Sequence, residues 1–176
     1  MNGLRVGVGF DEHPFATGAE RARSLVLGGV RFETEPALRG HSDADVVAHA
    51  VADAMLGAAG LGDLGAHFPD SDERWAGADS LVILGHVAAL LTKAGLRLVN
   101  ADCTVVCEAP RVSASREIMI ERLSAAAAGP VHVKATRPEG LGSLGRVEGI
   151  ACLAVALVEE IGAFHCACCL CHVVPP

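Results

Sequence analysis

The sequence predicts an α+β fold, a two-layer sandwich in which helices cover one face of a mixed sheet. Segments with the two-residue alternation of strands are interspersed with segments of helical periodicity. The helical segments are rich in alanine, and aromatic residues make up only 3% of the chain. Small side chains allow layers to approach closely, so we expect flat, tightly packed contacts between the sheet and its helices.

Four segments have strand character. Residues 4–10 alternate apolar side chains with arginine and glycine, which is a period of two. Residues 23–32 form one or two shorter strands, broken at Gly28 and Gly29. Residues 96–108 and 131–137 complete the predicted strands.

Four segments have helical character: residues 43–59, 79–94, 113–127 and 148–161. Ser42 or Asp43 is suited to cap the first turn of the first helix, because both residue types accept hydrogen bonds from free amides there. Gly95 is placed to end the second helix. The fourth predicted helix is apolar almost throughout.

Composition excludes several classes of protein. A net charge of −7 argues against nucleic acid or an anionic membrane as the main partner. Charges or glycines interrupt every apolar stretch before it reaches the length of a membrane span. The first residues lack the pattern of a secretory signal, so we expect a cytoplasmic protein. We expect one domain over residues 1–162, followed by a cysteine-rich tail over residues 163–176.

The seven cysteines do not suggest a disulfide framework. Cys103, Cys107 and Cys152 lie in apolar segments, where a thiol acts as a small buried hydrophobe. The others crowd into the tail: Cys166, Cys168, Cys169 and Cys171. With His165 and His172 they could bind a soft metal, but we favour a disordered extension.

Two elements supply a candidate metal site. Asp11 and His13 follow the first strand one residue apart, so in an extended chain both side chains point to one side while Glu12 points away. His49 lies within the first helix. Three protein ligands with an open fourth position are typical of a catalytic zinc site.

A ligating imidazole usually donates its second N–H to an acceptor. Asp45 and Asp53 lie four residues before and after His49, on the same helical face, and either could be that acceptor. The alternative is a polar helix face that carries a solvated histidine.

Five strings of residues occur in a familiar order and spacing. They are GFDEH at 9–13, HSDADVVAHA at 41–50, LGDLGAHFPDSD at 61–72, EAPR at 108–111 and VKATRPEGLGSLGRVEGIA at 133–151. Together they resemble the 2-C-methyl-D-erythritol 2,4-cyclodiphosphate synthase family over roughly residues 4–160.

The resemblance implies an activity and an assembly. It implies a phosphorus–oxygen lyase of non-mevalonate isoprenoid synthesis. This enzyme closes a cyclic diphosphate on a cytidine-diphosphate substrate and releases CMP. It also implies a homotrimer with active sites between subunits.

Two metal sites are implied as well. Asp11, His13 and His49 match the ligands of one zinc, or another divalent transition metal, per subunit. Glu139 matches the ligand of a second divalent ion, magnesium or manganese, that binds with the substrate.

The resemblance implies His41 and Arg137 as catalytic residues and a wider set that binds substrate. The phosphate end matches Asp11, Glu12, His13, His41 and Ser42. The erythritol segment matches Asp63, Leu64, Gly65, Phe68, Pro69, Asp70, Ser71 and Asp72, although Asp70 and Asp72 also fit a simple turn. The cytidine end matches Ala109, Pro110, Arg111, Val112, Ser113, Ala135, Thr136, Arg137, Pro138 and Glu139. Ser143 and Arg146, with Glu148, match residues near a central channel of the trimer.

The chain departs from the family's usual pattern at four positions. Arg137 and Pro138 replace hydroxyl residues after Thr136, Ser143 replaces a larger apolar residue, and Val147 replaces a glycine. Two other functions remain open. A zinc phosphohydrolase would use the same ligands to activate water, and a non-enzymatic metal-binding protein would act through the tail.

Overall fold

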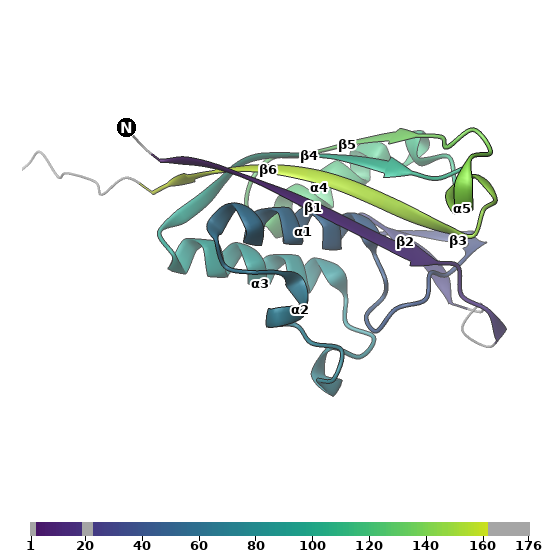
Figure 1. The fold of residues 1–176 in the computed structure, drawn as a ribbon, viewed down its shortest axis with the longest axis horizontal. Coiled ribbons are helices and arrows are strands. Elements are labelled where there is room, and N and C mark those ends of the chain that lie inside the picture. The colour runs from purple at the N-terminus through teal and green to yellow at the C-terminus, as the bar shows by residue number, and fades with distance from the viewer. Residues whose placement is uncertain (1–2, 19–22, 162–176) are drawn as a thin grey trace, which may run out of the picture.

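The computed structural model describes residues 3–18 and 23–161 (Figure 1). Its main sheet has the strand order β1 (Leu4–Pro14), β6 (Gly149–Glu160), β4 (Leu96–Val106) and β5 (Val131–Thr136). β6 is antiparallel to both neighbours, whereas β4 and β5 are parallel, so the sheet is mixed as predicted. β2 (Ser24–Leu27) and β3 (Val30–Pro36) form a separate hairpin. The predicted tail lies outside the described residues.

Three long helices cover one face of the main sheet: α1 (Val46–Ala59), α3 (Ser80–Lys93) and α4 (Arg116–Ala127) (Figure 1). Shorter helical pieces join them: α2 (Leu64–His67), η2 (Glu73–Trp75), η3 (Val112–Ala114) and α5 (Gly142–Gly145). The predicted α+β sandwich is therefore confirmed. Within the described part of the chain, no helix is both long and apolar enough to span a membrane.

The prediction of a helix over residues 148–161 is wrong, because this segment is the central strand β6. Alternate residues Cys152, Ala154 and Ala156 are buried beneath α1, while Leu153 and Val155 face outward. Both faces are apolar, so the sequence shows no polar alternation that would reveal a period of two. Alanine also favours helices, and pairing with two neighbouring strands overrides that preference.

β1 approaches α1 unusually closely because it carries two glycines. A Cβ atom added at Gly7 would lie 2.1 Å from the carbonyl oxygen of Ala54, and one at Gly9 would lie 2.1 Å from that of Ala50. No side chain fits at either position without moving the helix. The two glycines therefore set the distance between the middle of β1 and the face of α1 that carries Ala50, Ala54 and Ala58.

Asp45, not Ser42 or Asp43, caps α1, so that prediction is wrong. The fully buried carboxylate of Asp45 accepts hydrogen bonds from the amides of Val47 and Ala48 and from those of Gly28 and Gly29 in the β2–β3 turn. It therefore ties the start of α1 to the hairpin. Gly95, in the left-handed region at φ +75°, follows the end of α3 as predicted.

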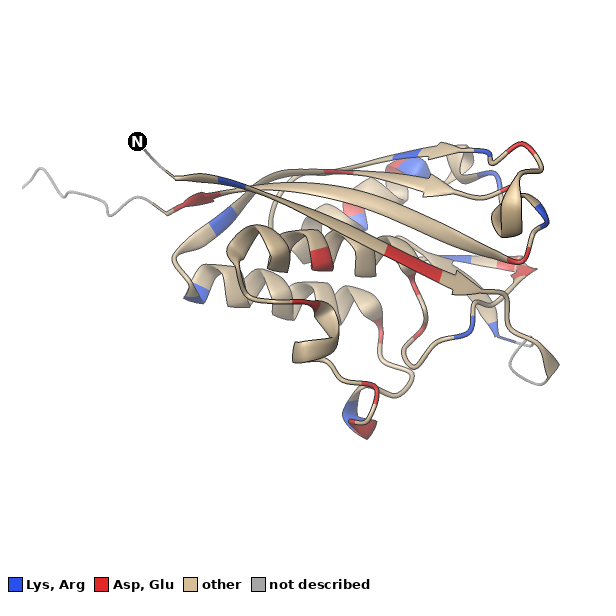
Figure 2. Ribbon diagram, viewed as in Figure 1, with Lys and Arg blue, Asp and Glu red and all other residues tan. Residues whose placement is uncertain are grey.

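The outer face of the sheet is apolar along β1 and β6. Figure 2 shows acidic residues at the C-terminal end of β6 and no charged residue along its middle. Leu4, Val6, Val8, Phe10, Leu153 and Val155 are between 43% and 65% exposed. A row of exposed large apolar side chains on adjacent strands is the kind of surface that another protein surface usually covers. The three cysteines of the sheet region, by contrast, are buried and free, as predicted.

Candidate metal centre and substrate cavities

The predicted triad comes together at the junction of β1 and α1. β1 continues past Phe10 to Pro14, so Asp11 and His13 project toward α1 while Glu12 is exposed on the other face. His49 meets them from the first turns of α1, with its Nδ1 atom 2.9 Å from Oδ2 of Asp11. The ligand atoms of the three residues all lie within 4.8 Å of one another. One ion could contact all three.

The donor atoms suit a divalent transition metal. Nε2 of His13 lies 3.2 Å from Oδ2 of Asp11, yet it is buried and makes no aligned hydrogen bond to any described residue. A buried nitrogen without a partner is costly unless something else binds it. Two imidazole nitrogens and one carboxylate oxygen form a common ligand set for zinc. The triad therefore fits the metal that the sequence predicts.

The triad also perturbs its own protonation. Burial alone would raise the pKa of Asp11, but the contacts and charges of His13 and His49 outweigh it and hold that pKa far below its usual range. Burial alone would lower the pKa of His49, but the hydrogen bond and charge of Asp11, together with the charges of Asp45 and Asp43, raise it. Asp11 is therefore an anion at neutral pH and a strong ligand for a cation.

The predicted acceptors behind His49 are wrong. Asp45 is occupied by two amides at the start of α1 and two in the β2–β3 turn, and Asp53 accepts from the amide of Leu64. Nε2 of His49 instead contacts the hydroxyls of Ser80, at 2.9 Å, and Ser42, at 3.1 Å. Ser80 is the first residue of α3, and helical spacing around His49 could not reveal a partner on another helix.

The triad opens into a cavity of about 420 Å³. From the predicted set, the residues that line it are Asp11, His13, His41, Ser42, His49, Leu64, Gly65, Phe68 and Asp70. The phosphate-end and erythritol segments are thus brought together around the metal ligands. Glu12, Asp63, Pro69, Ser71 and Asp72 do not line this cavity. Asp63 caps α2 and Asp72 pairs with Arg74, so both have local structural roles.

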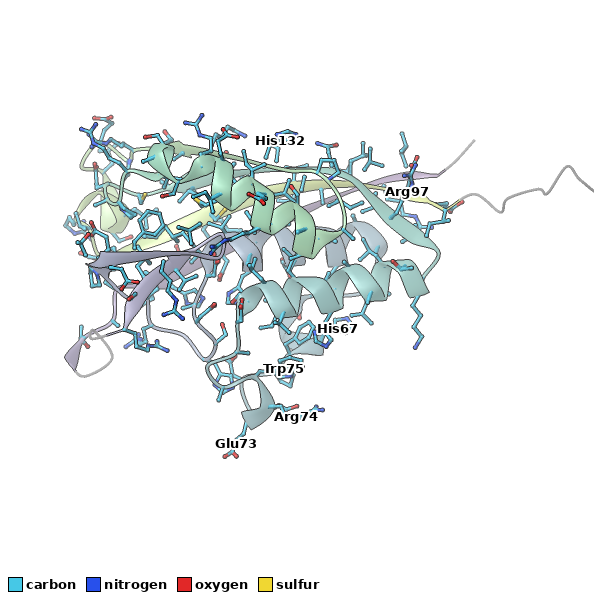
Figure 3. All side chains as sticks on the ribbon, turned by 180° about the vertical axis from the view of Figure 1, so that it is seen from behind. His67, Glu73, Arg74, Trp75, Arg97 and His132 are labelled. Carbon is cyan, nitrogen blue, oxygen red and sulfur yellow. The ribbon has the colours of Figure 1, made fainter. Side chains whose placement is uncertain are left out.

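Five lining residues were not predicted from the sequence: Pro14, Arg39, Gly40, Trp75 and Ile83. Arg39 stands two residues before His41, and a cation beside a predicted phosphate contact was the available signal. Trp75 packs edge-to-face on Phe68, with ring centroids 4.8 Å apart. Figure 3 shows Trp75 in the segment that projects beyond α3, away from the sheet. No sequence pattern placed that ring against the cavity.

A second cavity, of about 340 Å³, lies at the ends of β4 and β5. It is lined by Cys107, Glu108, Pro110, Arg111, Val112, Ser113, Arg116, Ala135, Thr136 and Arg137. Most of the predicted cytidine-binding set is therefore in one place, whereas Ala109, Pro138 and Glu139 are not part of the lining. Burial and the charge of Glu108 raise the pKa of Cys107 to about 11, so its thiol is neutral near pH 7.

A third cavity, of about 200 Å³, lies between the end of β1 and the segment from α5 to the start of β6. Ser143 and Glu148 line it together with Glu12 and His13. Arg146 pairs with Glu148, with Nε and Oε1 2.7 Å apart, and both side chains are exposed. Val147 between them has φ +60°, a conformation that favours glycine. The glycine that the family resemblance implies at this position would adopt such a conformation without strain.

Comparison with known proteins decides the family. The profile of the YgbB family matches residues 4–159, nearly all of the described chain. The chain belongs to this family. A relative from Rubrobacter xylanophilus, named 2-C-methyl-D-erythritol 2,4-cyclodiphosphate synthase, is 54% identical over 91% of this chain and 98% of its own length. The resemblance stated from the sequence is therefore confirmed.

Solved structures of family members agree. The bifunctional IspDF of Campylobacter jejuni superposes with a TM-score of 0.84 at 34% identity, over 91% of this chain and 43% of that longer chain. The IspF of Plasmodium falciparum, solved as a CDP complex, superposes with a TM-score of 0.77 at 30% identity, over 92% of this chain and 99% of that chain. The family fold and the mixed sheet with its helices are shared.

Proposed function

We propose that this chain is a cyclodiphosphate synthase, a phosphorus–oxygen lyase of non-mevalonate isoprenoid synthesis. It converts 4-diphosphocytidyl-2-C-methyl-D-erythritol 2-phosphate to 2-C-methyl-D-erythritol 2,4-cyclodiphosphate and CMP. In this reaction an oxygen of the 2-phosphate attacks the β-phosphorus, and the bond to CMP breaks. The observation that carries the proposal is the Asp11–His13–His49 triad, which faces a cavity lined by His41 and Ser42 in a chain of this family.

No protein nucleophile is needed for such a ring closure. The chain has to position two phosphates and offset their charge. A zinc ion held by the triad would supply Lewis-acid polarisation of a phosphate oxygen. The amides of Val47 and Ala48 at the start of α1 are already bonded to Asp45, so they are not free to bind phosphate. His41, Ser42 and the neighbouring Arg39 are therefore the groups we assign to the phosphate end.

The arginine-lined cavity at β4 and β5 supports a cytidine-diphosphate site. Arg111, Arg116 and Arg137 offer charged donors to a diphosphate, which guanidinium groups bind strongly. Because the thiol of Cys107 is neutral near pH 7, Cys107 does not act as an anionic nucleophile there. We assign the second ion, magnesium or manganese, to Glu139, an exposed carboxylate in the loop that follows this cavity.

We propose that the active enzyme is a homotrimer with its active sites between subunits. Asp11 and His13 of the triad lie on β1, and the arginine-lined cavity reaches the end of β5; these two strands are the edges of the main sheet. Three strand spacings separate them, roughly 14 Å within one subunit. A neighbouring subunit can bring the two halves together. The exposed apolar face of β1 and β6 supplies a surface for that contact.

A turnover assay tests the function. The full chain would be incubated with the cytidine-linked substrate, zinc and magnesium, and the products identified by mass. We expect CMP and the cyclic diphosphate in equal amounts. Release of inorganic phosphate instead would favour a zinc phosphohydrolase, and no turnover would favour a metal-binding protein. Action in the cytoplasm stays a prediction, to be checked by cell fractionation.

A further inference from the structure

A buried chain of hydroxyl groups lies behind His49, on the side away from the metal ligands. Ser80 is 1% exposed and Ser42 is 6% exposed, and both contact Nε2 of His49. Asp43 lies behind Ser80 and accepts a hydrogen bond from its hydroxyl. Asp43 makes no hydrogen bond to His49 among the contacts of the described chain, so its hydrogen-bonded path to the imidazole runs through Ser80.

Counting donors fixes the direction of this chain. An ionised carboxylate can only accept hydrogen bonds. Asp43 accepts from the hydroxyl of Ser80 and, at 3.2 Å each, from the amides of Ser80 and Asp45. The single hydroxyl hydrogen of Ser80 is then used, and its oxygen presents only lone pairs to His49. Nε2 of His49 must be the donor in that contact.

In a neutral imidazole, the position of the proton on one ring nitrogen determines that the other nitrogen carries a lone pair. With the proton on Nε2, Nδ1 of neutral His49 carries a lone pair, and Nδ1 is the atom 2.9 Å from Oδ2 of Asp11. We propose that Asp43, acting through Ser80, is a positioning residue that holds His49 in the tautomer that can bind the metal. This inference rests on the metal centre of the proposed function.

The two serines at Nε2 then have different tasks. Ser42 accepts from the amide of Ala44 at 3.2 Å, and it lines the cavity of the triad. Among the described residues, the remaining acceptor for its hydrogen is Ser80, at a long 3.4 Å. Its hydroxyl hydrogen is therefore left for a ligand oxygen in the cavity. Ser80, by contrast, serves only the orientation of His49.

Zinc affinity of the full chain, measured by competition with a chromophoric chelator, tests the proposal. Ser80→Ala removes the acceptor and should weaken zinc binding about 10–100-fold, the usual effect of losing such a partner. Ser42→Ala should weaken it much less, although Ser42 touches the same nitrogen. Asp43→Asn should weaken it as well, because an amide can donate as well as accept and no longer fixes the direction of the Ser80 hydroxyl.

Two controls separate this role from a structural one. Asp79 caps the same helix α3 from an exposed position, so Asp79→Ala should lower the free energy of unfolding without changing zinc affinity. If Asp43 acts only through Ser80, a double variant that combines Asp43→Asn with Ser80→Ala should bind zinc no more weakly than Ser80→Ala alone. Additive losses, native zinc affinity in Ser80→Ala, or an equal loss in Asp79→Ala would each overturn the proposal.

Failure of the proposed function gives a different result. If the native chain binds zinc and Ser80→Ala weakens that binding, the positioning role stands even when no cyclic product forms. If the product forms but Ser80→Ala binds zinc as the native chain does, the proposed function stands and the positioning role is wrong.

Discussion

At the scale of single residues, the metal centre depends on how Asp11 and His49 hold protons. The pKa of Asp11 is lowered and that of His49 is raised, so the metal-free pair is a carboxylate beside an imidazole that protonates readily. A metal can bind His49 only after Nδ1 has lost its proton. The proton and the metal therefore compete for the same atom.

This competition predicts a pH dependence. As pH falls through the raised pKa of His49, zinc affinity should fall by up to about tenfold per pH unit, while Asp11 stays ionised and contributes no change. In the metal-free chain, the stability of the fold depends on pH in the opposite direction. A raised pKa stabilises the fold while His49 is protonated, so stability should decrease as pH rises through that pKa. Chelator competition and urea unfolding across pH would check both, and a flat zinc affinity would contradict the assignment.

Arg137 replaces a hydroxyl residue and lines the arginine-lined cavity. Pro138 restricts Arg137 to extended geometry, which favours a defined direction for its side chain. We predict that Arg137→Ala weakens substrate binding by roughly 1.5–3 kcal/mol, the range for hydrogen bonds to a charged group, mainly through KM. Lys93→Ala, which removes one positive charge at the end of α3, is the control. Unchanged KM and kcat in Arg137→Ala would show that the arginine points to solvent.

The metal ligands could be predicted from the sequence, but their surroundings could not. Asp11, His13 and His49 follow from strand and helix spacing together with the family strings. Ser80 and Trp75 reach the site from later segments of the chain, 31 and 26 residues beyond His49. Local periodicity carries no information about such contacts, because they arise only when α3 packs against α1.

At the scale of elements, the contact between β1 and α1 decides the geometry of the site. Gly9→Ala would place a methyl group 2.1 Å from a backbone oxygen of α1, so the helix must move. We predict a loss of stability of about 1–3 kcal/mol from overpacking, together with weaker zinc binding as His49 shifts from Asp11.

Gly57→Ala is the matched control for this change. It lies on α1 itself, and its nearest neighbour would be Val8 at an unstrained 3.8 Å. Alanine favours a helix over glycine by about 0.5–1 kcal/mol, so this variant should be as stable as the native chain or more so. Urea unfolding and chelator competition would measure both. Native stability and zinc affinity in Gly9→Ala would contradict the account.

The wrong prediction of a helix over residues 148–161 is also explained at the scale of elements. β1 was predicted because glycine and arginine interrupt its apolar residues, whereas β6 is apolar on both faces. A strand between two others, with a helix on one face and an apolar surface on the other, has no polar face. Its side-chain period of two therefore cannot be seen in the sequence. Only the pairing of β6 with β1 and β4 distinguishes it from a buried helix.

At the scale of the whole molecule, the apolar outer face of the sheet has to be explained. If copies of this chain cover it, a charge placed there should prevent assembly. We predict that Val8→Glu, at a side chain that is 60% exposed, converts the proposed trimer to monomers and abolishes turnover. Val82→Glu, at an equally apolar side chain on α3, should leave the trimer intact. Light scattering would decide, and a native chain that is monomeric and active would contradict the assembly.

The central claim is that a metal on the triad drives the ring closure, and one comparison tests it most directly. Native chain and His49→Ala would be purified in parallel, and their metal content, circular dichroism and yield of cyclic diphosphate measured on the same samples. We predict about one zinc per native chain, and a folded His49→Ala that has lost most of its metal and its product. Stoichiometric zinc with full product formation in His49→Ala would contradict the account.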